Sequence, residues 1–134
     1  MPERGPEAFS YAVLRVVPDL ARGERFNAGV VLFCRRHGFL GVRWRLDPAR
    51  LATLAPAAEP ALASALEAEL DLRARVAAGE AGAGPLSELP PSERFGWLVA
   101  PTSTMIQPSE VHIGLCDDPG RELDALFAQL VAVR

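Results

Sequence analysis

Lysine is absent from the 134-residue sequence, and all fourteen basic residues are arginine. Alanine is abundant as well, and the two biases together indicate GC-rich coding, so we expect a bacterial source. A single arginine is therefore a weak sign of function here, because some of these arginines stand where another genome would place lysine.

Long apolar runs are also absent. Charged residues interrupt every hydrophobic stretch, so none approaches the roughly 20 apolar residues that span a bilayer. The N-terminal segment carries prolines and charges and is interrupted at Arg15, unlike the continuous apolar core of a signal peptide. We therefore expect a cytoplasmic protein without a membrane span.

Cysteine is scarce, with only Cys34 and Cys116, and in a chain without an export signal we expect both thiols to be reduced. The net charge of -3 disfavours binding to duplex nucleic acid without sequence preference, which depends on neutralising phosphates. The sequence has no Gly-x-Ser-x-Gly elbow, Walker loop or dinucleotide-binding glycine fingerprint. Common hydrolase and nucleotide-binding folds are therefore disfavoured, and no cofactor is expected.

The content of 49% hydrophobic and 23% charged residues is ordinary for a globular protein, and the length predicts one domain over residues 1–134. Residues 9–17, 25–33 and 39–46 are rich in β-branched and aromatic residues, which predicts three strands in a meander. The short link at 35–38 contains glycine and predicts a hairpin. Two further short β-like pieces lie within 102–115.

Helical patterns occupy much of the remaining chain. Apolar residues at helical spacing predict a long helix over 60–78 that ends at Gly79, a short helix over 92–100 and a C-terminal helix that begins at Asp118. The Gly- and Pro-rich segment 80–91 predicts a flexible loop inside the domain. Together these patterns predict an α+β fold of two layers, in which an antiparallel sheet of three to five strands carries the long and C-terminal helices on one face.

The third predicted strand has two different faces. Leu40, Val42 and Trp44 alternate with Arg43 and Arg45, because successive side chains of a strand point to opposite sides. This alternation predicts an apolar face for the helices and a basic face that could receive a partner.

Three segments resemble a known family. They are Arg15-Val-Val-Pro18-Asp19, Arg22-Gly-Glu24-Arg-Phe-Asn27-Ala-Gly29-Val-Val-Leu-Phe33 and Asp118-Pro119-Gly-Arg-Glu122-Leu-Asp-Ala-Leu-Phe127. The family is that of small bacterial proteins called domain of unknown function 3037, and the likeness includes little of residues 50–90. It implies a fold unit without an assigned activity. Its members are often encoded beside kinases resembling the HipA type, which implies a kinase of that kind as a partner.

One group of polar residues is a candidate ligand site. Arg15, Asp19, Glu24 and Asn27 flank the predicted connection between the first two strands, so a hairpin would bring them to one end of the sheet. Carboxylates beside an arginine could bind a cation or a phosphate, or act as acid and base. The alternative is structural, with Asp19 and Glu24 shaping the connection and Asn27 satisfying backbone groups.

Two further candidate sites have weaker support. Cys34, His37, His112 and Cys116 offer four zinc-type ligands, although a cysteine in a reduced protein is commonly a small buried apolar residue. Arg35, Arg36, Arg43 and Arg45 could form a basic patch around the second hairpin, but no aromatic residue shares its predicted face, as a single-strand-binding surface would require.

These observations favour a non-enzymatic regulatory or protein-interaction module that binds its partner through Arg43 and Arg45. Two alternatives stay open. One is an enzyme or ligand-binding domain that uses the polar cluster on a phosphate-bearing or metal-bound substrate. The other is nucleic-acid binding through the arginine hairpin.

Overall fold

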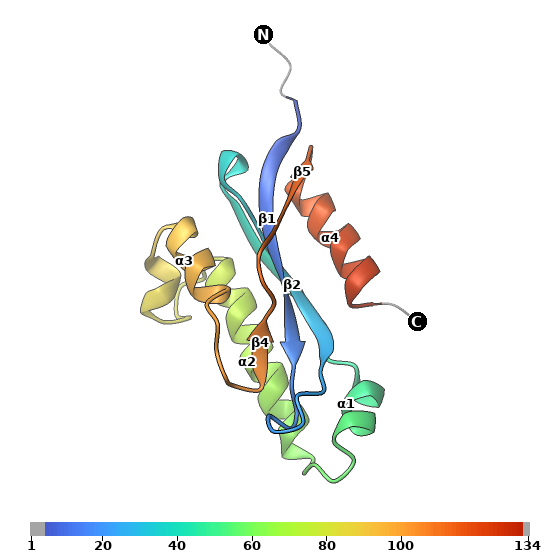
Figure 1. Cartoon of the computed structure of the whole chain (residues 1–134). Coiled ribbons are helices and arrows are strands. Elements are labelled where there is room, and N and C mark those ends of the chain that lie inside the picture. Colours follow the sequence, from blue (N-terminus) through green and yellow to red (C-terminus); the bar gives the residue numbers. More distant parts are fainter. Residues whose placement is uncertain (1–4, 133–134) are drawn as a thin grey trace.

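The computed structural model describes residues 5–132, which form a five-stranded antiparallel sheet and four α-helices (Figure 1). This arrangement confirms the α+β class and the antiparallel sheet. The strands are β1 (Glu7–Val16), β2 (Phe26–Cys34), β3 (Phe39–Trp44), β4 (Ile106–Pro108) and β5 (His112–Cys116). The helices are α1 (Pro48–Leu54), α2 (Ala61–Ala77), α3 (Pro91–Leu98) and α4 (Pro119–Leu130), with short 3-10 helices η1 (Arg35–His37) and η2 (Pro85–Glu88).

Strand β1 lies inside the sheet, which has the order β3-β2-β1-β4, with β5 also paired to β1. The predicted meander of the first three strands is confirmed, and Gly38 closes the second hairpin with a left-handed φ of 59°. Along its other edge β1 meets two strands, β5 opposite Glu7–Tyr11 and β4 opposite Leu14–Val16. Strands β4 and β5 together therefore take the place of one long strand along this edge of β1.

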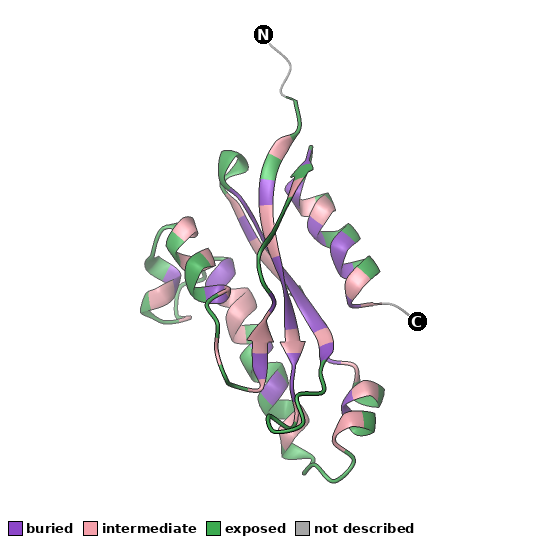
Figure 2. Cartoon of the chain, in the orientation of Figure 1, coloured by how far each residue is buried: buried purple, intermediate pink, exposed green. Residues whose placement is uncertain are grey.

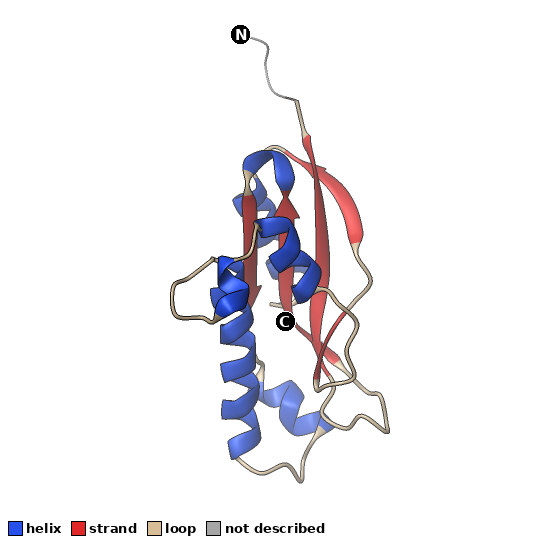
Figure 3. Ribbon diagram, turned by 90° about the vertical axis from the view of Figure 1, so that its left-hand side faces the viewer, coloured by secondary structure: helices blue, strands red, loops and turns tan. Residues whose placement is uncertain are grey.

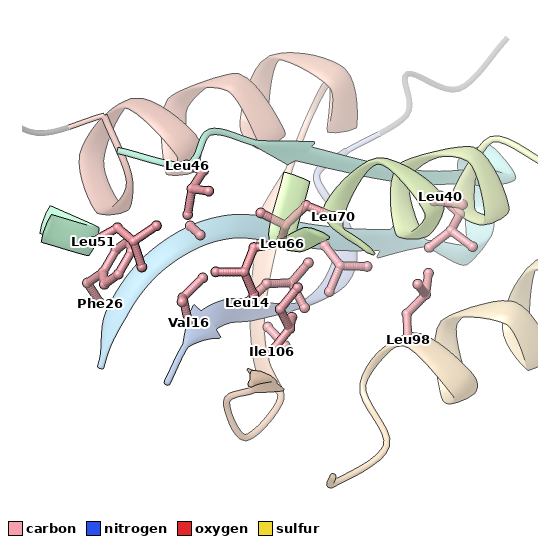
Figure 4. Close-up of a cluster of buried hydrophobic side chains, with 14 of the residues drawn as sticks. Leu14, Val16, Phe26, Leu40, Leu46, Leu51, Leu66, Leu70, Leu98 and Ile106 are labelled. Atoms are coloured by element: carbon pink, nitrogen blue, oxygen red, sulfur yellow. The ribbon is translucent and has the colours of Figure 1, made fainter. Parts of the chain in front are cut away.

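The sheet separates two hydrophobic cores. Along β2, Val31 and Phe33 belong to the core beneath α1, α2 and α3, whereas Val30 and Leu32 belong to the core beneath α4. Figure 4 shows Leu66 and Leu70 of the first core directed towards the sheet. The buried members contributed by α4 to the second core are Leu123, Leu126 and Phe127.

The position of α4 differs from the sequence-based expectation. The long and C-terminal helices were expected on one face, but α2 and α4 pack on opposite faces and make three layers (Figure 1). The reason lies in β2, where every residue except Asn27 is buried. A strand that is apolar on both sides must be covered on both sides.

The helices begin and end largely as the sequence predicts. Helix α2 ends before Gly79, which adopts a φ of 66°, and Glu69 pairs with Arg73 at 2.9 Å one turn apart. The loop after α2 contains η2 and is fastened by Arg94, whose Nη2 donates to the carbonyl of Ala77 at 3.3 Å. The flexibility expected for 80–91 stays a prediction. Within residues 5–132, no helix has both the length and the apolar character needed to cross a membrane.

A buried serine joins β4 to β5. The amide of Ser109 donates to the carbonyl of Val13 at 2.8 Å, and the Ser109 hydroxyl accepts from the amide of Val13 at 2.8 Å. The hydroxyl also donates to the carbonyl of Glu110 at 2.9 Å, and Ser109 is only 5% exposed. A side chain therefore takes the place of a backbone acceptor where the ladder along β1 is interrupted.

Replacing this serine tests the junction. Ser109→Ala should lower the free energy of unfolding by about 1–3 kcal/mol, because the buried amide of Val13 loses its acceptor. Urea denaturation followed by circular dichroism measures the effect. Ser103→Ala is the matched control, since Ser103 is exposed. Equal stabilities of the two variants would contradict the role given to Ser109.

A second prediction concerns Gly114 in β5. A Cβ atom at this position would lie 2.6 Å from the ring of Phe9, which is itself buried. Gly114→Ala should therefore destabilise the fold by about 1–3 kcal/mol through overpacking.

The matched control for Gly114 is Gly96 in α3. A Cβ atom there meets nothing within 4 Å. Gly96→Ala should stabilise the protein by about 0.5–1 kcal/mol, because alanine is the better helix former. Thermal melts of the two variants should shift in opposite directions, and a shift in the same direction would contradict the packing at Gly114.

Candidate functional site

The four residues of the polar cluster divide into two pairs with separate surroundings. Arg15 and Asn27 are cross-strand partners on β1 and β2, so they share a face of the sheet. The Asn27 side-chain amide donates to the carbonyl of Leu130 at 3.0 Å and thereby ties β2 to the end of α4. Asn27 therefore has a structural contact, as the alternative interpretation of the cluster expects.

Asp19 and Glu24 lie in the exposed connection between β1 and β2. The carboxylate of Asp19 accepts from the amides of Ala21 and Arg22 at 3.1 and 3.3 Å, and Glu24 pairs with Arg22 at 2.8 Å. The surface hollow beside Asp19 is lined by mainly apolar residues that include Leu20, Leu54 and Met105, and by none of the other three cluster members. The four side chains therefore do not converge on one site.

The four zinc-type ligands do not assemble either. Cys34 and Cys116 are buried in the core beneath α4. His112 is at the opposite end of β5 from Cys116. Its ring is tilted by 35° against that of Tyr11, with centroids 5.2 Å apart, and its Nε2 lies 3.6 Å from Glu110. Across residues 5–132, no three histidine, cysteine or acidic side chains come together in a way that could hold a metal ion.

The cysteines have the properties of buried core residues. Burial, together with the neighbouring Cys34, Glu122 and Asp117, raises the pKa of the Cys116 thiol to about 11. Cys34 donates a weak hydrogen bond to the carbonyl of Ala8 at 3.5 Å. A thiol with this pKa is protonated at neutral pH and is a poor nucleophile or metal ligand.

The arginines of the second hairpin are also separated. Arg43 Nη1 donates to Asp124 of α4 at 2.6 Å, and its guanidinium lies 4.5 Å from the centroid of the Phe127 ring. Arg43 of the expected basic face therefore contacts the chain's own α4, while its side chain stays 50% exposed. Arg45 is exposed just beyond β3. Arg35 and Arg36 lie at the other end of that strand, in η1.

The structure shows an exposed apolar surface that the sequence-based candidates did not include. Ile113 and Leu115 of β5 are 77% and 68% exposed, and they lie opposite Ser10 and Ala8 of β1. Their face is that of the α2 core, beyond the area that the helices cover. We call Ala8, Ser10, Ile113 and Leu115 the open sheet surface, which is bordered by the buried Phe33.

Figure 3 views the sheet from the side of α2 and α3, and strands at one edge stand clear of these helices. Most of β5 is coloured as exposed in Figure 2. The alternation of Val111, Ile113 and Leu115 was a usable signal for a strand. It did not reveal that this apolar side would lack a cover, because that depends on where distant helices pack.

The shifted pKa of Cys116 gives a prediction for alkaline pH. Because the folded state holds the thiol protonated, Cys116 contributes stability that is complete below its ordinary pKa and is lost as pH rises towards about 11. The free energy of unfolding should therefore fall over this range in the wild type and fall less in Cys116→Ala. Denaturation at a series of pH values measures this free energy for both proteins. An identical pH dependence in the two would contradict the raised pKa of Cys116.

Comparison with known proteins identifies the family. No curated protein and no solved structure matches the chain. One family model, described as a protein of unknown function (DUF3037), matches residues 11–131. This match includes β1 from its second half, all the remaining strands and all four helices, so the earlier resemblance is confirmed. The chain belongs to the DUF3037 family of proteins of unknown function.

Proposed function

We propose that this protein is a non-enzymatic regulatory module that binds another protein through the open sheet surface. The observation that carries the proposal is the exposure of Ile113 and Leu115, at 77% and 68%, on a part of the sheet that the helices leave uncovered. Adjacent exposed apolar side chains on an otherwise well-packed protein mark interaction surfaces.

The position of β5 at the edge of the sheet supports the same proposal. Within the described chain, β5 pairs only with β1, so its outer edge presents free backbone donors and acceptors. Edge strands are commonly protected by charges or proline, and β4 has Pro108. Strand β5, from His112 to Cys116, contains no proline, no arginine and no acidic residue. An incoming segment could therefore use both the free edge and the apolar face.

This surface has better support than the other candidates. Arg43 is already bound to α4, which leaves Arg45 as the freely exposed member of the pair expected to bind a partner. Asp19 and Glu24 have contacts within their own connection, and Asn27 bonds to the end of α4, so their presence has an explanation without a ligand. The separation of the arginines likewise removes the compact basic patch on which nucleic-acid binding depended.

The partner and the cellular location are part of the same proposal. The family resemblance implies a kinase resembling the HipA type, and we propose such a kinase as the first partner to test. The module would act in the cytoplasm of a bacterium, which agrees with the arginine-only composition and the lack of a membrane-spanning pattern in the sequence.

The experiment is an affinity pull-down from the native host, repeated with a purified kinase resembling the HipA type. The variant is Ile113→Ser with Leu115→Ser, and the control is Leu20→Ser, which removes a leucine that is 51% exposed in the β1–β2 connection. Covering each apolar side chain contributes about 1.5–3 kcal/mol. The double variant should therefore bind the partner at least about tenfold more weakly.

Wild type and Leu20→Ser should retain one stoichiometric partner that the double variant loses. Recovery of no partner by the wild type contradicts the interaction module. Binding of a different single protein preserves the module and rejects the kinase. Equal retention by the double variant rejects the open sheet surface as the binding site.

A further inference from the structure

We infer that the open sheet surface receives an acidic peptide segment that carries apolar side chains. The inference rests on the proposed function and adds the chemical class of the partner. Two features of the surface lead to it, an apolar hollow and a pair of arginines along its rim.

The hollow has a volume of about 430 Å3 and spans three strands. Its floor contains Ala8 and Ser10 of β1, Phe33 of β2 and Ile113 of β5. Ser10 is the cross-strand partner of both Phe33 and Ile113, so these side chains form one continuous row across the sheet. Such a row suits apolar side chains of an incoming segment.

Arg35 and Arg36 line the same hollow from η1. Arg36 has a long contact with Glu7, at 3.9 Å, and its side chain is 76% exposed. Arg35 lies 5.5 Å from the centroid of the Phe33 ring, and none of the ion pairs found in residues 5–132 includes it. Both guanidiniums therefore keep hydrogen-bond donors for carboxylates of a partner.

The charges distinguish this partner from a second copy of the chain. Pairing of two copies edge to edge at β5 would cover Ile113 and Leu115. It would leave Arg35, which follows β2 on the far side of β1, without a carboxylate partner. A nucleic acid fits less well, because Phe9 and Phe33, the aromatic residues of the hollow, are buried and offer no open ring for stacking.

The test uses short synthetic peptides and the full chain labelled with 15N. The first peptide has two leucines flanked by glutamates, and the comparison peptides replace every glutamate by glutamine or by lysine. In NMR titrations at low salt, the glutamate peptide should shift the amides of Ala8, Ser10 and Ile113. It should bind about tenfold more tightly than the glutamine peptide, and added salt should reduce this difference.

The matched variants remove equal charge from two ends of the molecule. Arg35→Gln with Arg36→Gln should weaken binding of the glutamate peptide about tenfold. Arg22→Gln with Arg25→Gln should leave the affinity unchanged, because these exposed arginines belong to the β1–β2 connection and its end. An equal loss in both double variants would reduce the effect to net charge and overturn the inference.

Other outcomes separate this inference from the proposed function. Equal binding of the glutamate, glutamine and lysine peptides at the hollow would overturn the acidic preference and leave an apolar interaction surface intact. Absence of shifts at the hollow with every peptide would overturn the inference, while the pull-down with Ile113→Ser and Leu115→Ser judges the interaction module separately. A dimer in analytical ultracentrifugation that these serine substitutions abolish and the Arg35 and Arg36 substitutions do not would assign the surface to a second copy.

Discussion

Strand β1 is ten residues long, and because it is largely buried its backbone needs hydrogen-bond partners along both edges. Strand β2 supplies them along one edge, from Ser10 to Val16. The other edge has no single strand of sufficient length, so β4 and β5 divide it between them. Strands β4 and β5 follow β1 by about a hundred residues in the sequence. Completing this edge of the sheet therefore brings the N-terminal and C-terminal parts of the chain together.

The division between β4 and β5 requires a local solution at Ser109. There the hydroxyl group replaces the missing backbone acceptor and keeps the amide of Val13 bonded. Strand β5 can then continue along β1 to the N-terminal end of that strand, beyond the part of the sheet that α2 and α3 cover. Satisfying the backbone of β1 in this way leaves Ile113 and Leu115 without an internal partner. A structural requirement and the proposed binding surface thus arise from the same strand.

Helix α4 covers the face of the sheet opposite to the open sheet surface. It packs on the opposite face from α2 and uses Leu123, Leu126 and Phe127, which Arg43 covers at the margin. Arg43 and Asp124 form an exposed ion pair at the margin of this interface, so Arg43 of β3 is linked to α4. Arg35 and Arg36 line the hollow on that other face, and their guanidiniums give the proposed partner an acidic character.

Much of the fold could be predicted from the sequence because its signals are local. Alternation and β-branched residues located the first three strands, and Gly38 and Gly79 ended their elements through left-handed backbone conformations. Asp47 and Asp118 cap α1 and α4 by accepting from backbone amides, as expected of an acidic residue before proline. The family was likewise recognisable from segments at both ends of the chain.

The candidate sites could not be predicted in the same way. Closeness along the chain suggested that Arg15, Asp19, Glu24 and Asn27 converge, but strand pairing brings together only Arg15 and Asn27, while Asp19 bonds to backbone amides within its own turn. By itself the sequence determined the elements, their caps and the apolar character of β5, because each depends on neighbouring residues. Only the tertiary structure decided that Arg43 pairs with Asp124 of α4 and that Ile113 and Leu115 stay exposed, because contacts and burial depend on which distant segments pack against each face.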